Sequence, residues 1–495
     1  MSTESNSNSE DSNVLREDRI EKLQGLRDKG VNPYPHSYER THELAEIKES
    51  YQNELESGDE TEDPVRVAGR VVGFRDMGKA SFFDVKDGSG ELQGYTNVDL
   101  LGEDDYETLK EMDRGDFIGL EGVVFVTNRG ELSIKVHGFQ VLSKSLRPLP
   151  EKWHGLQDVE KRYRQRYLDL IANEEVRQTF IARSQLISSF RRRLDDRDFL
   201  EVETPLMQPA AGGATAEPFV THHNALDQDL YLRIAPELYL KRLIIGGMEK
   251  VYELGKNFRN EGVSTEHNPE FTTIEIYEAY ADYEDAMELT EELISKATEE
   301  AIGTVKPELD EGTLDLTPPW ERISMVSAVE KETGLDDLKG TPAEELADFA
   351  QKNGIDLPED VEEPSWGELV EVLFEEFVED ELFQPTFITD FPTDISPLAK
   401  TKRDGDRSLT ERFEVFLAGI ETGNAFTELN DPLEQRERFG DGSDEGKDRD
   451  FLQALEYGMP PTAGIGIGLD RLLMAITGAE SIREVILFPA LRRKE

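Results

Sequence analysis

The chain of 495 residues is long enough for two or more domains, and its 37% hydrophobic content argues against a disordered protein. It lacks cysteine and any apolar run of about 18 residues, which excludes thiol chemistry, disulfides and a membrane span and predicts a cytoplasmic protein. Its 55 basic and 106 acidic residues give a net charge of −51, spread along the chain, which predicts a solvated acidic coat suited to high salt, as in halophilic proteins. A protein that stayed folded and active in low-salt buffer would contradict this last prediction.

The N-terminal segment, residues 1–63, is predicted to be a disordered tail followed by a helical segment. Met1–Asp11 is rich in Ser, Asn and Glu and lacks the apolar region of a signal peptide. Val14–Lys29 has apolar residues at helical spacing and is followed by Gly30 and Pro33, which end helices.

The apolar period changes to two between Val65 and Leu142, which is typical of strands. The apolar runs begin at Val65, Phe83, Leu92, Phe117 and Leu132. A short helix is predicted at Tyr106–Met112, between the third and fourth runs. Five short strands with a helix after the third indicate an OB-fold barrel over residues 64–145, with an SH3-like barrel as the alternative.

A linker is predicted over residues 146–170, because Arg147–Pro150 contains two prolines and is stiff. The basic island, defined here as Lys144–Arg166, holds seven basic residues against three acidic ones. Such an island in an acidic chain predicts either a local anionic partner or a set of structural salt bridges, and the sequence favours neither.

The rest of the chain, residues 171–495, is predicted to be one α+β domain. An apolar stripe over Val176–Leu194 indicates a long helix, and Phe199–Thr204 indicates a strand that ends at Pro205. Further strands are predicted at Tyr231–Ile234, Val251–Asn257, Thr272–Tyr280, Thr410–Ile420 and Ala463–Ile467. Further helices are predicted at Pro236–Ile245, Tyr283–Ala301, Pro342–Asn353 and Trp366–Glu379, and a surface loop at Phe439–Asp450. Because strands and helices do not alternate regularly, we expect a mainly antiparallel β-sheet flanked by helices.

Two strings in this domain carry an arginine in a setting that suits phosphate binding. The first is Phe258–Gly262 with the sequence FRNEG, followed by His267–Phe271 with the sequence HNPEF; the second is Gly464–Arg471, GIGIGLDR. A planar guanidinium can hold phosphate oxygens in a two-pronged manner. The glycine string lacks the GxGxxG spacing of a dinucleotide loop, and no Walker A string occurs.

These strings resemble motifs 2 and 3 of the class II aminoacyl-tRNA synthetases, and the chain from about Arg16 to Arg492 is similar to the lysyl-tRNA synthetases of that class. The resemblance implies an N-terminal five-stranded OB-fold barrel that binds the anticodon and a C-terminal class II synthetase domain. The implied reaction is a ligase reaction: L-lysine and ATP form lysyl-adenylate, and lysine is transferred to the 3′-OH of tRNA(Lys). The resemblance also implies a homodimer, formed through the long helix and the strand before Pro205, with no membrane or DNA partner.

The resemblance assigns residues to each substrate. Those implied in ATP binding are Arg259, Glu261, His267, Phe271, Glu414 and Arg471, with Arg259, Glu261 and Arg471 catalytic. Glu414 and Glu421 are implied as ligands of magnesium, with up to three Mg²⁺ ions in each active site. Those implied in lysine binding are Gly213, Glu237, Arg259, Glu275, Tyr277, Asn424, Phe426 and Glu428. A charged amine needs buried acceptors, and the carboxylate of Glu428 argues against aspartyl or asparaginyl specificity.

The residues implied in anticodon binding are Phe82, Gln93 and Glu131. Phe82 and Phe83 must face opposite sides of a strand, and the resemblance places Phe82 outward. One departure is Glu217, where the family usually has a basic residue. The alternatives are a relative that lysylates a protein, which the OB-fold domain argues against, and an inactive tRNA-binding protein, which the retained catalytic residues argue against.

Overall fold

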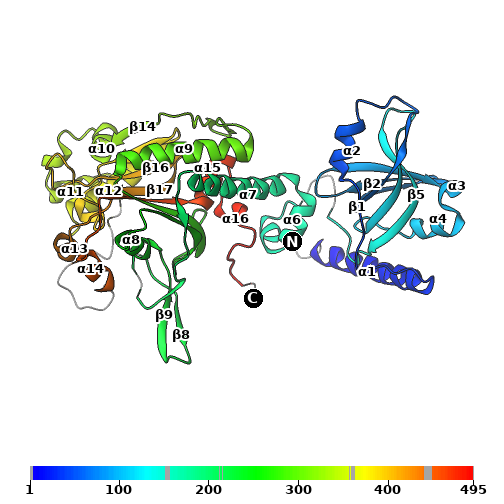
Figure 1. Cartoon of the computed structure of the whole chain (residues 1–495), viewed down its shortest axis with the longest axis horizontal. Helices are drawn as coiled ribbons and strands as arrows, with labels where there is room; N and C mark the ends of the chain where they lie inside the picture. Colours follow the sequence, from blue (N-terminus) through cyan, green and yellow to red (C-terminus); the bar gives the residue numbers. More distant parts are fainter. Residues whose placement is uncertain are drawn as a thin grey trace. The chain divides into compact units, whose positions relative to one another are not determined.

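The structure, a computed structural model, describes residues 4–150, 156–210, 212–213, 216–355, 357, 363–439 and 449–493, and of residues 4–12 only the backbone. The chain forms two compact units, residues 1–156 and 157–495 (Figure 1). In the part of the chain that is described, no helix is both long and apolar enough to cross a membrane.

The first unit is a closed five-stranded barrel with strand order β1-β2-β3-β5-β4. Its strands are β1 (Glu60–Asp76), β2 (Ala80–Lys86), β3 (Glu91–Asn97), β4 (Phe117–Val126) and β5 (Leu132–Ser143). Its helices are α1 (Glu4–Asp28), α2 (Leu44–Tyr51), α3 (Val98–Leu101) and α4 (Glu103–Lys110). The predicted OB-fold outline, with a helix between the third and fourth strands, is confirmed, and closure leaves the barrel without exposed edges.

Helix α1 begins at Glu4, well before the predicted start at Val14. Once a helix is nucleated, each added residue gains one hydrogen bond, so a polar segment can extend a helix that an apolar stripe has started. Helix α1 is anchored through Arg19, whose guanidinium donates to the carbonyl oxygens of Arg114 and Arg147, each at 3.0 Å. The tail and the first helix are therefore one element over the described residues.

Several basic residues of the basic island form structural ion pairs. Lys144 is buried, and its Nζ lies 2.5 Å from Asp113. Arg162 and Arg166 both pair with Asp169, at 2.9 and 2.6 Å. For these three basic residues, the salt-bridge alternative is favoured over an anionic partner.

The second unit is built around an eight-stranded sheet with strand order β14-β15-β16-β17-β18-β11-β10-β6. The strands are β6 (Leu200–Glu201), β10 (Lys250–Phe258), β11 (Glu270–Ala279), β14 (Glu321–Ser324), β15 (Thr386–Thr389), β16 (Arg412–Leu417), β17 (Ile420–Thr427) and β18 (Thr462–Gly468). All neighbours are antiparallel except β14 with β15 and β6 with β10, so the expected mainly antiparallel sheet is confirmed. Smaller sheets are formed by β7 (Met207–Gln208), β8 (Val220–His223) and β9 (Gln228–Leu232), and by β12 (Glu308–Leu309) and β13 (Gly312–Thr313).

The helices of this unit flank the large sheet. They are α5 (Val159–Arg164), α6 (Arg166–Ala172), α7 (Glu174–Asp195), α8 (Glu237–Ile245), α9 (Tyr283–Ile302), α10 (Met325–Thr333), α11 (Ala343–Lys352), α12 (Trp366–Phe377), α13 (Pro432–Arg438), α14 (Arg449–Leu455), α15 (Leu469–Thr477) and α16 (Ile482–Val485), with short 3₁₀ turns at Leu338–Gly340, Glu379–Glu381 and Thr393–Ile395. The predicted helices correspond closely to α7, α8, α9, α11 and α12. The loop predicted at Phe439–Asp450 lies mostly outside the described residues, and α14 begins at Arg449.

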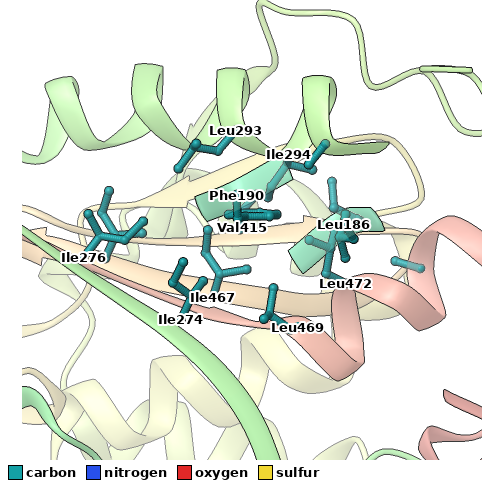
Figure 2. Close-up of a cluster of buried hydrophobic side chains, with 14 of the residues drawn as sticks. Leu186, Phe190, Ile274, Ile276, Leu293, Ile294, Val415, Ile467, Leu469 and Leu472 are labelled. Carbon is teal, nitrogen blue, oxygen red and sulfur yellow. The ribbon is translucent and has the colours of Figure 1, made fainter. Parts of the chain in front are cut away.

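One face of the large sheet packs against α7, α9 and α15 to form the main core (Figure 2). Strand β11 contributes Ile274 and Ile276, and β18 contributes Ile465 and Ile467, so alternate residues of each strand enter the core. These strands therefore point their intervening residues to the opposite face of the sheet.

The prediction of one continuous strand over Thr410–Ile420 is wrong, because the structure has a hairpin turn within this range. β16 ends at Leu417 and β17 begins at Ile420, with Ala418 and Gly419 between them. Both turn residues have positive φ, 52° and 73°, which is the geometry of a tight two-residue hairpin turn. The Ala-Gly pair is a weak turn signal within an apolar run, which explains why the pattern predicted one strand.

Candidate active site

The sheet face opposite the main core lines a cavity of about 780 Å³. The lining includes these predicted site residues: Gly213, Glu237, Arg259, Glu261, His267, Phe271, Glu275, Tyr277, Glu414, Glu421, Asn424, Phe426 and Arg471. They come from strands, helices and loops that are distant in the sequence, and the alternation of the strands directs them to one face. Of the residues predicted in this unit, only Glu428 is absent from the lining, and it lies directly behind Gly464, as described below.

Two arginines project from different parts of the cavity wall. The guanidinium of Arg259 lies over the ring of Phe271, 5.2 Å from its centroid, and its Nε is buried with no hydrogen-bond partner among the described residues. Arg471 donates to Glu421 Oε2 at 2.7 Å, and its Nη2 lies 3.1 Å from His267 Nε2. A buried guanidinium nitrogen without an acceptor is a group that a bound anion would satisfy.

The loop after β10 carries the remaining predicted residue of the first string, Glu261, which is exposed at the cavity. In the same loop, the backbone N–H of Asn260 donates to the backbone oxygen of Glu217 at 2.7 Å. This contact uses no side-chain atom of Glu217, and Glu217 is not part of the cavity lining. The side chain of Glu217 is therefore not part of the described cavity wall.

A pair of carboxylates faces the cavity from the β16–β17 hairpin. Burial, followed by the charge of Glu421, raises the pKa of Glu414 to about 8. Arg412 donates to Glu414 Oε1 at 2.7 Å and to Asn424 Oδ1 at 3.2 Å, so it holds both side chains in place. Over the residues that the structure describes, no group of three or more His, Asp or Glu side chains is arranged to hold a metal by itself. Two carboxylates fit Mg²⁺, which usually shares protein ligands with waters and phosphate oxygens.

The deepest part of the site is acidic. Burial, followed by the charge of Glu237, raises the pKa of Glu275 to about 8, and Tyr277 Oη donates to Glu275 Oε2 at 3.3 Å. Glu428 is fully buried, which raises its pKa, and its Oε1 has no hydrogen-bond partner in the described part of the chain. A Cβ added to Gly464 would lie 1.9 Å from this oxygen, so the glycine leaves Glu428 within reach of the cavity. Such a group of buried acceptors suits a ligand that carries ammonium groups.

Two residues of this site are missing from the sequence-based prediction. Lys241 lies one helical turn after Glu237 on α8, and its Nζ donates to Glu237 Oε1 at 2.5 Å. Arg412 stands two positions before Glu414 on β16, on the same face of the strand. Helical and strand periodicity place each of them beside a predicted residue, so the sequence did contain a signal for both.

The three residues predicted to bind an anticodon lie on the barrel of the first unit. The ring of Phe82 packs at 4.9 Å from that of Tyr95, while Phe83 is fully buried in the barrel core. Gln93 is buried, and its Oε1 accepts from Ser133 Oγ at 3.2 Å, whereas Glu131 is exposed in the turn before β5. The structure thus gives Phe82 and Phe83 opposite faces of β2, as the sequence predicts.

Comparison with known proteins identifies the relatives of both units. Residues 158–492 match the family of class II tRNA synthetases for D, K and N, and residues 65–142 match the OB-fold nucleic acid binding domain. The chain is 52% identical to a lysine–tRNA ligase of Pelotomaculum thermopropionicum over 501 residues, covering 99% of this chain and 97% of the relative. It is 51% identical to one from Bacillus cereus (96% and 97% covered) and 50% identical to one from Carboxydothermus hydrogenoformans (98% and 99% covered). At this identity and coverage, the chain belongs to the lysine–tRNA ligase family of class II tRNA synthetases.

Proposed function

We propose that the protein activates L-lysine with ATP and transfers it to the 3′-OH of tRNA(Lys). The observation that carries this proposal is the convergence of two arginines and a group of acidic side chains on the wall of one cavity. The arginines suit a triphosphate, and the acidic side chains suit an amino acid with two ammonium groups. Relatives that match nearly the whole chain are named lysine–tRNA ligases, which supports the same activity.

The first step joins a carboxylate oxygen of lysine to the α-phosphorus of ATP, while the bond to the bridging oxygen breaks and diphosphate leaves. Arg259 would hold the α-phosphate and the lysine carboxylate, and Arg471 and His267 would hold the outer phosphates. Phe271 would stack on adenine, and Glu261 would accept from it. Catalysis of this kind consists mainly of positioning and charge stabilisation, which fixed guanidinium groups supply.

Glu414 and Glu421 would hold magnesium. The raised pKa of Glu414 supports this, because burial and a neighbouring carboxylate make its ionised form costly until a cation is present. When bound, the ion would neutralise charge on the phosphate oxygens. Arg412 would keep Glu414 and Asn424 in place, with Asn424 beside the lysine carboxylate.

In the second step, the terminal 3′-hydroxyl of the tRNA attacks the carbonyl carbon of lysyl-adenylate, and AMP leaves. The acceptor end must therefore enter the same cavity, whereas the anticodon would bind the barrel of the first unit. Lysine itself would be held with its α-amine at Glu237 and Gly213 and its ε-ammonium at Glu428, Glu275 and Tyr277, with Phe426 in contact with the side chain.

Lysine-dependent exchange of labelled diphosphate into ATP tests the first step, and charging of tRNA(Lys) tests the second. Absence of the exchange would indicate an inactive tRNA-binding protein. Exchange without tRNA charging would instead indicate an enzyme that lysylates another acceptor, such as a protein.

We also propose a homodimer formed through α7 and β6. Leu200, at the open edge of the large sheet, is 54% exposed, and Ile181 on α7 is 41% exposed. Met207, a few residues after β6, is 53% exposed. Exposed apolar side chains beside an unpaired strand edge are typical of a surface that is covered in an assembly.

Gly464→Ala is expected to raise the Michaelis constant for lysine by about 10- to 100-fold. The new Cβ would lie 1.9 Å from Glu428 Oε1 and 2.7 Å from Tyr277 Cε1, and overpacking of this kind costs about 1–3 kcal/mol. Diphosphate exchange at varied lysine concentration measures the effect. Gly25→Ala in α1, where a Cβ meets nothing within 4 Å, is the control, and equal constants for the two variants would contradict the prediction.

Phe82→Ala is expected to raise the Michaelis constant for tRNA(Lys) by about tenfold or more, because stacking on one base contributes about 1–3 kcal/mol. Diphosphate exchange should stay at its normal rate, since Phe82 lies in the barrel unit and outside the cavity. Measuring both reactions on one preparation provides the internal control. A parallel loss of both reactions would show that the substitution damages the fold instead of an RNA contact.

A further inference from the structure

Beneath the floor of the cavity lies an ammonium group that belongs to the protein itself. Lys241 on α8 has a fully buried side chain, and its Nζ pairs with both Glu237 and Glu428. The same atom lies 5.3 Å from the ring centroid of Phe426 and 5.8 Å from that of Phe451. Neither Lys241 nor Phe451 lines the cavity. The ammonium of Lys241 therefore lies behind the cavity wall and is not open to a ligand.

The group around Lys241 contains three carboxylates, those of Glu237, Glu275 and Glu428. Burial raises the pKa of both Glu275 and Glu428; the charge of Glu237 adds to the effect on both, and the charge of Glu275 adds to the effect on Glu428. Burial alone would lower the pKa of Lys241, but the charges of Glu237 and Glu428 outweigh it and the pKa is raised. The ammonium is therefore charged, and it offsets part of the negative charge that the three carboxylates carry when they are ionised.

The other charged groups next to this cluster do not alter that balance. Arg233 and Glu253 lie near Glu275 and form a buried ion pair with each other, so they contribute no net charge. Tyr277, the remaining titratable neighbour, has a pKa well above its ordinary value and is uncharged. The negative charge that remains beside Lys241 suits an amino acid that carries two ammonium groups.

We propose that Lys241 is a positioning residue for lysine selection, which holds one oxygen of Glu428 and leaves Oε1 for the ε-ammonium of the substrate. This inference rests on the proposed function. Glu428 Oε2 faces Lys241, and Oε1 lies toward Gly464 at the cavity wall. Lys241 thus fixes both the direction of the acceptor and the amount of negative charge that the substrate must neutralise. An amino acid with an uncharged, apolar side chain leaves the buried Glu428 Oε1 without a partner, which is costly.

Lys241→Met tests the proposal, because methionine is of similar length and carries no charge. We expect the Michaelis constant for lysine to rise by about 10- to 100-fold, the effect of misplacing one hydrogen bond to a charged group, and that for ATP to change by less than about threefold. Diphosphate exchange gives both constants. Lys296→Met, at an exposed lysine of α9 whose Nζ pairs with Glu299, is the control and should change neither.

Lys241→Gln is the second variant, since its amide can still donate to Glu237 and Glu428 and so supports folding without the charge. A rise in the lysine constant is still expected from it, because the positive charge that sets the charge of the pocket is lost, whether or not Lys241→Met folds. An unchanged lysine constant in a folded variant, or an equal rise in the ATP constant, would overturn the proposal. If the unmodified protein shows no lysine-dependent exchange, the proposed function fails instead, so the two failures are distinguishable.

Discussion

Arg259→Ala is expected to reduce lysine-dependent diphosphate exchange by about a thousandfold or more. The Nε of Arg259 is buried and has no acceptor among the described residues, and the guanidinium lies over the ring of Phe271 at the cavity wall. In the proposed site it contacts both reacting groups, the α-phosphate and the attacking carboxylate. Removing a fixed cation from a phosphoryl-transfer site removes charge stabilisation that is needed most in the transition state.

The appropriate measurement is the exchange rate at saturating ATP and lysine, because a loss that persists there is a loss of kcat. Arg436→Ala is the matched control: Arg436 lies on α13, is exposed and pairs with Glu456. Thermal unfolding of both variants would check that the fold is retained. Near-normal exchange by a folded Arg259→Ala protein would contradict the assigned role.

The strand alternation that builds the cavity is visible in the sequence. Glu275 and Tyr277 alternate with Ile274 and Ile276, and this pattern alone separates a polar face from a core face. The alternation does not determine which strands are neighbours in the sheet. For example, β18 lies between β11 and β17 although it is the last of the three in the sequence. The family resemblance alone therefore implies that Arg259 and Arg471 belong to one site. The strand order of the large sheet explains how both reach the same cavity.

Other features depended on tertiary contacts that a local pattern does not contain. The strand predicted over Phe199–Thr204 is reduced to β6, two residues at the sheet edge, because the paired register with β10 covers Leu200 and Glu201, and Val202 adds one backbone hydrogen bond to Tyr252. The strand predicted over Tyr231–Ile234 belongs to the small sheet, as part of β9, and not to the large one. Local propensity indicates an extended backbone in both cases, and the available partner decides the length and the sheet.

The basic island illustrates the same limit for charges. Composition shows an excess of basic residues, but not whether they meet protein carboxylates or a ligand. Lys144 and Asp113 are far apart in the sequence and are joined only by the fold of the barrel. The charge count leaves an anionic partner and structural salt bridges equally open, and the geometry of Lys144, Arg162 and Arg166 favours salt bridges within the chain.

Glu428→Gln is expected to raise the Michaelis constant for lysine by about 100-fold and that for ATP by only a few-fold. The substitution keeps the size of the side chain and removes its charge, so the substrate ammonium loses a charge-assisted hydrogen bond of ~3 kcal/mol. Glu428 is behind Gly464 and apart from Arg259 and Arg471, so phosphate binding should be preserved. Diphosphate exchange with each substrate varied in turn gives the two constants.

Glu456→Gln, at an exposed glutamate that pairs with Arg436, serves as the control and should change neither constant. Glu428→Gln also removes one of the two anionic partners of Lys241, leaving Glu237, and breaking a buried ion pair lowers the stability of the fold. Thermal unfolding with and without lysine separates this loss of stability from the loss of binding, because only the latter reduces the shift that lysine produces. Equal increases in the two Michaelis constants, with a normal lysine-induced shift, would show that Glu428 supports the wall of the cavity without receiving the substrate.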